Sequence, residues 1–199
     1  MKYWRLALRS LGLAALCAGC AKQQEQQAAA PPPGPARGTP EWKIADAMSA
    51  APAAIGQGAT IMDYPATPTG QPTQLRAGTN GWTCFPDMPE SPSDDPTCFD
   101  GQWMNWVPAW MGHTTPRVTA IGLAYMLQGS ADASASDPFK THPDSGQAWV
   151  VEGPHVMIIV PPSQSAMLAA MPDHQGGSQP WVMFKGTPYA HIMMPTAGN

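Results

Sequence analysis

The sequence predicts a single α+β domain, built on a mixed or antiparallel sheet of about five strands with a few short helices and long loops. Three observations support this fold class. Short segments with strand character lie between turns rich in Gly and Pro, mainly in the second half of the chain. Helical patterns are brief and end at or near prolines. The 24 prolines among 199 residues and the charged fraction of 12% are typical of a loop-rich domain.

Residues 1–19 predict a signal peptide. The basic residues Lys2, Arg5 and Arg9 accompany an apolar run, residues 6–16, which is too short to span a bilayer as a stable helix. Such a segment directs export and is removed, so it forms no part of the fold. We therefore expect an exported protein.

The end of the signal peptide, Leu16-Cys17-Ala18-Gly19-Cys20, is similar to a bacterial lipoprotein box. Cys17 departs from that pattern, since it stands where leucine is usual. We predict that Cys20 is lipidated, which would anchor the protein to the outer membrane or the periplasmic face. The alternative is ordinary signal cleavage, which would give a periplasmic or secreted protein.

The mature chain divides into a tether and a domain. Residues 20–40 are rich in Gln, Ala and Pro and predict a disordered tether, and residues 41–199 predict the single domain. Removal of the signal peptide lowers the ten Lys and Arg to seven and keeps all 14 acids, for a net charge of −7 with neutral His. This sign, with scattered basic residues, argues against a nucleic-acid partner.

The first element of the domain is a helix predicted over residues 41–50. Thr39 is placed to cap this helix, and Pro40 fits its first turn. Residues 59–64 and 74–76 follow as two short predicted strands.

Cys84 and Cys98 predict a disulfide. They are the cysteines that remain beyond the signal segment, and an even pair in an oxidising compartment favours a bridge. The enclosed residues 85–97 contain four prolines and few apolar side chains, so the bridge would close a loop with little packing of its own. A thiolate metal site is the alternative, but no third cysteine lies nearby.

A tryptophan-rich helix is predicted after Asp100, which is placed to cap it. Trp103, Trp106 and Trp110 recur at helical spacing, and Pro108 is expected to kink or split the helix. A stripe of this kind can stack on a ligand, but burial in the core is the interpretation we favour.

The second half of the domain predicts most of the sheet, with helices on one side of it. Its strands are expected over residues 119–127, 147–151, 155–160, 180–185 and 191–194. We expect residues 147–151 to pair with 155–160, and 180–185 to pair with 191–194. A short helix is predicted over residues 165–171, and the polar loop 129–146 is a place where function often resides.

Three phrases of the chain resemble a family of uncharacterised exported bacterial proteins. They are NGWTCFPD at residues 80–87, GPHVMI at 153–158 and GTPYAHIM at 186–193. The resemblance implies export and a single domain over most of the chain after residue 40, and it implies no activity.

Two His-x-Met pairs predict a metal site. His155 and Met157, and likewise His191 and Met193, stand two residues apart on predicted strands, so each pair projects from one face. If the two strands are neighbours, imidazole and thioether ligands that suit copper as Cu(I) would converge. The alternative is that the methionines fill the core and each histidine bonds a backbone carbonyl.

An enzyme needs a nucleophile with a base, or paired carboxylates on rigid elements. Neither arrangement stands out, and no recognised hydrolase, metalloprotease or phosphate-loop motif is present in the sequence. The candidate hydrolase or calcium-binding loop comprises Ser130, Asp132, Ser134, Ser136, Asp137, His142 and Asp144.

The sequence therefore favours an envelope protein that acts as a binding or interaction domain for an unknown protein or small molecule, without catalysis. Periplasmic copper binding through the His-x-Met pairs is the second hypothesis. Hydrolysis by loop 130–144 is the third.

Overall fold

A mixed β-sheet is the centre of the folded domain. The computed structural model describes residues 34–67, 70–88 and 90–196. The predicted signal peptide, Cys20 and the predicted tether up to residue 33 lie outside the described residues. Gly34–Asn199 is one compact unit, as the predicted single α+β domain requires.

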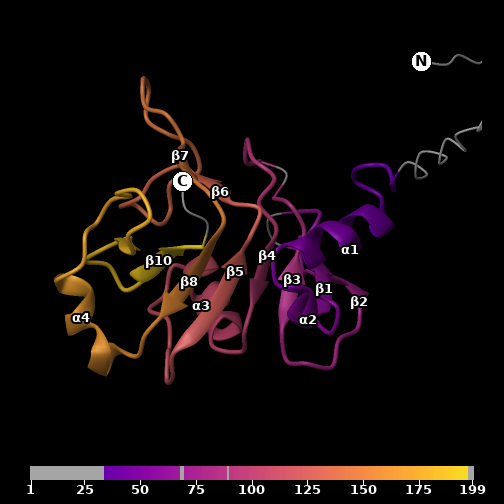
Figure 1. The fold of residues 1–199 in the computed structure, drawn as a ribbon, viewed down its shortest axis with the longest axis horizontal. Helices are drawn as coiled ribbons and strands as arrows, with labels where there is room; N and C mark the ends of the chain where they lie inside the picture. The colour runs from indigo at the N-terminus through magenta and orange to yellow at the C-terminus, as the bar shows by residue number, and fades with distance from the viewer. Residues whose placement is uncertain (1–33, 68–69, 89, 197–199) are drawn as a thin grey trace, which may run out of the picture. The chain divides into compact units, whose positions relative to one another are not determined.

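The main sheet has eight strands, and a separate pair of strands lies beside it (Figure 1). The main strands are β1 (Thr60–Asp63), β2 (Thr73–Arg76), β3 (Thr83–Phe85), β4 (Thr97–Phe99), β5 (Gly122–Met126), β8 (His155–Ile159), β9 (Trp181–Met183) and β10 (His191–Pro195). Their order is β2-β1-β3-β4-β5-β8-β10-β9, with β1 and β3 parallel and the other neighbours antiparallel. The separate pair is β6 (Ser130–Asp132) with β7 (Val150–Glu152), also antiparallel.

The mixed sheet is confirmed, but the predicted number of about five strands is wrong. The extra strands in the main sheet include β3 and β4, which have three residues each and hold the disulfide. A three-residue strand gives no readable alternation of apolar and polar residues, and it forms here because its neighbours supply the hydrogen bonds.

The predicted pairing of residues 147–151 with 155–160 is also wrong. β7 pairs with β6, a strand in the predicted polar loop, whereas β8 pairs with β5 and β10. Gly129 allows this arrangement, because its φ is +94° and a Cβ there would lie 2.5 Å from the Glu152 carbonyl oxygen. The predicted pairing of the last two strands is confirmed by β9 and β10.

Helix α1 (Pro40–Ser49) begins as predicted. The Thr39 hydroxyl accepts a hydrogen bond from the Trp42 backbone N–H at 3.2 Å, and Pro40 is the first helical residue. Arg37 pairs with Asp87 and lies over the Trp42 ring, so contacts with the domain extend into the segment predicted to be tether. The single turn α2 (Ala53–Gly56) follows α1.

The disulfide between Cys84 and Cys98 is confirmed. The two cysteines are direct partners in the β3–β4 ladder, and both are fully buried. They belong to a core cluster with alanines of α1, which places α1 on the disulfide side of the sheet.

Helix α3 (Trp103–Met111) covers the other face of the sheet. Trp103 and Trp106 are buried in the main core cluster with residues of β5, β8, β9 and β10, which confirms their predicted burial. Asp100 caps the helix, because its Oδ1 accepts hydrogen bonds from the backbone N–H groups of Gln102 and Trp103. Pro108 does not split the helix, which runs through it.

The helices therefore lie on both faces of the sheet, and the predicted placement on one side is wrong. Cys98 and Phe99 are adjacent and point to opposite faces: Cys98 contacts the α1 cluster, and Phe99 packs near Trp103. Figure 1 shows α1 and α2 at one end of the sheet and α4 (Ala166–Ala169) at the other. A 3₁₀ turn at Pro162–Gln164 precedes α4, which is shorter than the predicted helix.

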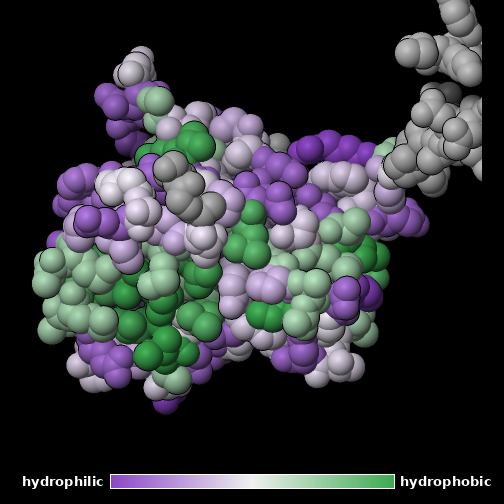
Figure 2. Space-filling view, viewed as in Figure 1, coloured by the Kyte–Doolittle hydropathy of each residue, from purple (hydrophilic) through white to green (hydrophobic). Residues whose placement is uncertain are grey.

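The face of β5, β8 and β10 opposite α3 carries an apolar surface beside α4. Ile158 and Val160 of this region are partly buried against Leu168. Figure 2 shows the hydrophobic area next to α4. Within the described part of the chain, no helix has both the length and the apolar character needed to cross a membrane.

Candidate functional site

A row of histidine and methionine side chains crosses the sheet face beneath α3. Three cross-strand pairs create it: Met126 with His155, Met157 with Met193, and His191 with Met183. Since paired residues and residues two apart on a strand share a face, all six side chains lie on one side of the sheet. We call Met126, His155, Met157, Met193, His191 and Met183 the His–Met row.

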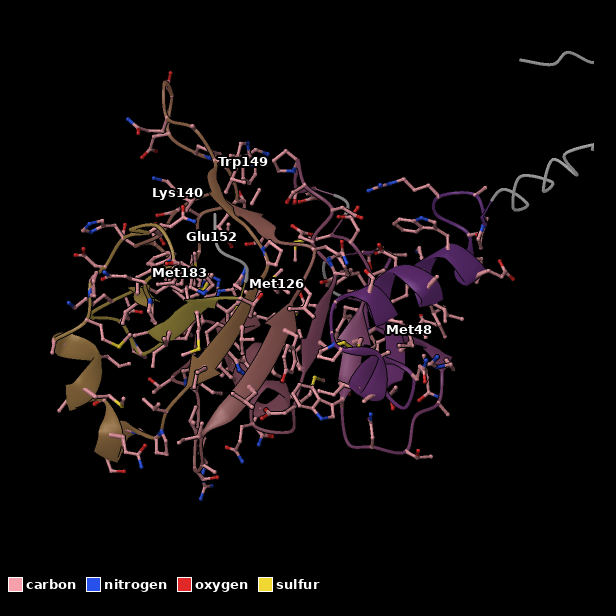
Figure 3. All side chains as sticks on the ribbon, in the orientation of Figure 1. Met48, Met126, Lys140, Trp149, Glu152 and Met183 are labelled. Carbon is pink, nitrogen blue, oxygen red and sulfur yellow. A yellow bond between two sulfur atoms is a disulfide. The ribbon has the colours of Figure 1, made fainter. Side chains whose placement is uncertain are left out.

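The His–Met row is part of the protein interior. His155 and His191 are 1% and 3% exposed, and Met157, Met193 and Met183 are also buried. Met126 is partly buried at the edge of the same core cluster. Figure 3 labels Met126 and Met183, which lie on the strands flanking the two histidine strands.

Backbone carbonyls fix the tautomer of both histidines. Nδ1 of His155 lies 2.7 Å from the Gly153 carbonyl oxygen, and Nδ1 of His191 lies 3.0 Å from that of Tyr189. A carbonyl only accepts, so each Nδ1 carries the proton and donates it. In the neutral ring, Nε2 then presents a lone pair.

Both histidines are held in the neutral form. The pKa of His191 is lowered to about 4, mainly by burial and in part by the charge of a protonated His155, against the opposing effect of the Tyr189 carbonyl. Burial also lowers the pKa of His155. Each ring therefore offers an unprotonated Nε2 at neutral pH.

Buried polar atoms without a hydrogen-bond partner concentrate at this face. In the described residues, the buried side-chain nitrogens and oxygens without a partner are Trp103 Nε1, Glu152 Oε1, His155 Nε2, Trp181 Nε1 and His191 Nε2. Trp103 packs against His191 with ring centroids 5.3 Å apart, and Trp181 is the direct cross-strand partner of Met193. Because buried polar atoms are normally paired, such a concentration identifies a candidate binding site.

The two histidines have different surroundings. His191 lies among aromatic rings, with centroids 5.3 Å from Trp103, 5.9 Å from Trp106 and 5.5 Å from Phe184. His155 follows directly after the turn that leaves β7 at Glu152. The His191 end of the row is therefore lined by aromatic rings, and the His155 end lies at the turn between β7 and β8.

Glu152, the last residue of β7, is a buried acid near Trp181 (Figure 3). The pKa of its carboxyl is raised to about 7: burial is the main cause, the charge of Asp132 adds to the rise, and the nearby Trp181 indole opposes it. The pKa of Asp132 is itself raised to about 6 by burial, although the Ser130 hydroxyl donates to its Oδ2 at 3.1 Å. Glu152 therefore titrates near neutral pH.

The four residues of the predicted metal site are all in the row. Their strands, β8 and β10, are neighbours, which is the condition that the sequence hypothesis set. The alternative, in which the histidines belong to the core, expects hydrogen bonds to backbone carbonyls, and these are also present. They involve only Nδ1 of each ring and leave Nε2 without a partner.

The sequence did not assign Met126, Met183 and Glu152 to the site. Met126 and Met183 stood in predicted strands, and each joins the row only through the register of its strand with a histidine strand, which is distant in sequence for Met126 and the next strand along the chain for Met183. Local periodicity does not contain this register, so no signal in the sequence could have selected them.

The residues of the predicted hydrolase loop converge only in part. Ser134, Ser136, Asp137, Lys140 and Asp144 line a shallow cavity of about 310 Å³, but Asp132 and His142 are not among its lining residues. Ser134 Oγ accepts hydrogen bonds from the backbone N–H groups of residues 136 and 137, and Lys140 pairs with Asp144 at 2.5 Å. In the described residues no base bonds Ser134 or Ser136. The loop's serine that does donate to a carboxylate, Ser130 to Asp132, is buried and does not line this cavity.

The described residues contain no group of three or more His, Cys, Asp or Glu side chains that could hold a metal ion. Metal binding at the His–Met row would therefore depend on thioether ligands. No protein-family model, curated protein or solved structure matches the chain. The candidate site is supported by its own geometry.

Proposed function

We propose that the protein is an exported envelope protein whose domain binds the soft metal ion Cu(I) through the His–Met row. One observation carries this proposal. Two buried neutral histidines donate from Nδ1 to a carbonyl, leave Nε2 without a partner, and alternate with buried thioethers. A metal-binding histidine characteristically donates its other nitrogen in this way, which orients the ring and makes it a better ligand.

The chemistry of the row favours a soft monovalent ion. Imidazole and thioether ligands suit Cu(I), whereas Ca²⁺ and Mg²⁺ require several oxygen ligands. The row itself contains no charged side chain, and burial of a charge without a counter-charge is costly. A monovalent ion carries less charge into the interior than a divalent one, so Cu(I) and its analogue Ag(I) fit the row better than Cu²⁺ or Zn²⁺.

Export is the second part of the proposal. The disulfide supports an oxidising compartment, because such bridges are rare in the cytosol. We propose that the signal peptide is removed and that lipidation of Cys20 anchors the domain to the envelope. Intact mass and membrane fractionation of the protein expressed in bacteria test this. An acyl adduct on Cys20 would support anchoring, and an unmodified mature chain in the soluble fraction would contradict it.

Cu(I) binding is tested by anaerobic titration against a chromophoric Cu(I) chelator, with ascorbate as reductant. His155→Asn and His191→Asn are the informative variants, because Asn keeps a donor near the Nδ1 position and lacks Nε2. The double variant that carries both substitutions should not bind Cu(I). His142→Asn is the matched control, since His142 is exposed in the loop, and this variant should bind like the wild type. A wild-type protein that does not compete with the chelator would contradict the proposal and leave the row as core packing.

A further inference from the structure

The register of β8 and β10 separates the two histidines. The Met157–Met193 pair is the centre of the row, and each histidine lies two residues before the methionine of its own strand. Because the strands are antiparallel, the histidines lie on opposite sides of this pair. Four residues at roughly 3.3 Å each put them about 13 Å apart along the strands.

The hydrogen bonds of the rings set the direction in which each Nε2 points. His155 Nδ1 is held by Gly153, and His191 Nδ1 is held by Tyr189. Each carbonyl lies two residues before its histidine, on the side away from the central methionines. Since Nδ1 and Nε2 leave the ring in nearly opposite directions, each Nε2 is turned toward the methionine of its own strand. An ion bound by both Nε2 atoms would require them within roughly 4 Å of each other, given metal–nitrogen bonds of about 2 Å.

Each histidine has methionines of its own. Met126 lies directly opposite His155, and Met157 follows on the same strand face. Met183 lies directly opposite His191, and Met193 follows on the same strand face. Direct cross-strand partners have Cβ atoms about 5 Å apart, which brings the imidazole and thioether within reach of one ion.

From this register we propose that the row forms two Cu(I) sites. The first comprises His155, Met126 and Met157, and the second comprises His191, Met183 and Met193. Each supplies one imidazole nitrogen and two thioether sulfurs. This inference rests on the proposed function and goes beyond it, because it assigns two ions to the chain and gives each ion its own ligands.

The two sites differ in what surrounds them. The His191 site lies among Trp103, Trp106 and Phe184. The His155 site includes the partly buried Met126 and lies next to the β7–β8 turn. We expect the two ions to bind with different affinities, with the His155 site more accessible to exchange.

The test is the stoichiometry of binding to the full mature chain under the anaerobic titration, with Ag(I) as a second probe. The wild type should bind two equivalents, and His155→Asn and His191→Asn should each lose one of the two. Methionine methyl NMR with Ag(I) gives an independent readout. Shifts of Met126 and Met157 should disappear in His155→Asn, and shifts of Met183 and Met193 should remain.

Met126→Leu and Met183→Leu test the same assignment in variants that keep the volume of the side chain. Each should weaken one of the two binding events and leave the other. If the wild type binds one equivalent of Cu(I), and either histidine variant loses it, the two-site inference is overturned and the proposed function stands. Absence of binding in the wild type would overturn both.

Discussion

Met157 of β8 and Met193 of β10 lie directly opposite each other, and both are buried beneath α3. Their thioethers separate two histidines whose Nε2 atoms have no hydrogen-bond partner. The pair therefore belongs both to the core and to the candidate site. Substitutions that keep core volume but remove sulfur separate these two roles.

Replacement of Met157 and Met193 by leucine should affect binding more than stability. Leucine has nearly the same volume as methionine, so each change should cost less than about 1.5 kcal/mol in the free energy of unfolding. Loss of a ligand sulfur should weaken Cu(I) binding at least about tenfold, since loss of even a supporting partner at a metal site has an effect of this size. Urea denaturation and chelator competition measure the two quantities. Met167→Leu on α4, which is exposed, should change neither, and unchanged affinity in both core variants would contradict the ligand role.

Removal of the disulfide should destabilise the domain strongly. The bridge closes a loop with a sequence separation of 14, and its two sulfurs lie in the core against α1. Replacement of both cysteines by alanine should lower the free energy of unfolding by about 3 kcal/mol, because the unfolded chain gains the freedom of an open loop. Denaturant unfolding measures this. The wild-type protein under reducing conditions should behave like the variant, and a variant as stable as the oxidised protein would contradict the prediction.

Asp100 should contribute more to stability than an exposed acid. Its Oδ1 accepts from the first turn of α3, and its Oδ2 accepts from the Leu123 N–H at 2.7 Å, which joins α3 to β5. Asp100→Ala leaves these donors without their partner and should cost about 2 kcal/mol. Asp144→Ala, which removes an exposed ion pair with Lys140, should cost about 0.5 kcal/mol or less. Equal unfolding midpoints for the two variants would argue against the cap.

The features that the sequence predicted well are local. Thr39 and Pro40 mark the start of α1 because capping and proline geometry depend on neighbouring residues. The tryptophan spacing of α3 marks its buried face for the same reason.

The features that were missed depend on register between distant segments. β6 and β7 form because Gly129 can approach Glu152. Met126 lies opposite a histidine because β5 pairs with β8 in one register among several, and Met183 does so because β9 pairs with β10 in one register among several. The His-x-Met pattern identified four of the six residues of the row, since residues two apart on a strand share a face. Which residues lie opposite one another is decided by the packing of the whole sheet, which no short pattern contains.

The pH dependence of stability should carry a contribution from Glu152. Its pKa is raised from 4.5 to about 7 in the folded state, mainly by burial. Between these values the folded protein holds the proton more tightly than the unfolded chain, so this group makes the free energy of unfolding fall as pH rises. Glu152→Gln stays neutral and removes the effect. Relative to the wild type, the free energy of unfolding of Glu152→Gln should therefore increase by up to about 3 kcal/mol between pH 4.5 and pH 8, measured by urea denaturation at each pH.

The comparison with the wild type separates Glu152 from the other titrating groups. Subtraction of the wild-type curve cancels the titration of His191 and Asp132 where the substitution leaves these groups unchanged. Glu90→Gln, at an exposed position, should show no such gain. A pH-independent difference between Glu152→Gln and the wild type would mean that the Glu152 carboxyl is solvated in the folded protein.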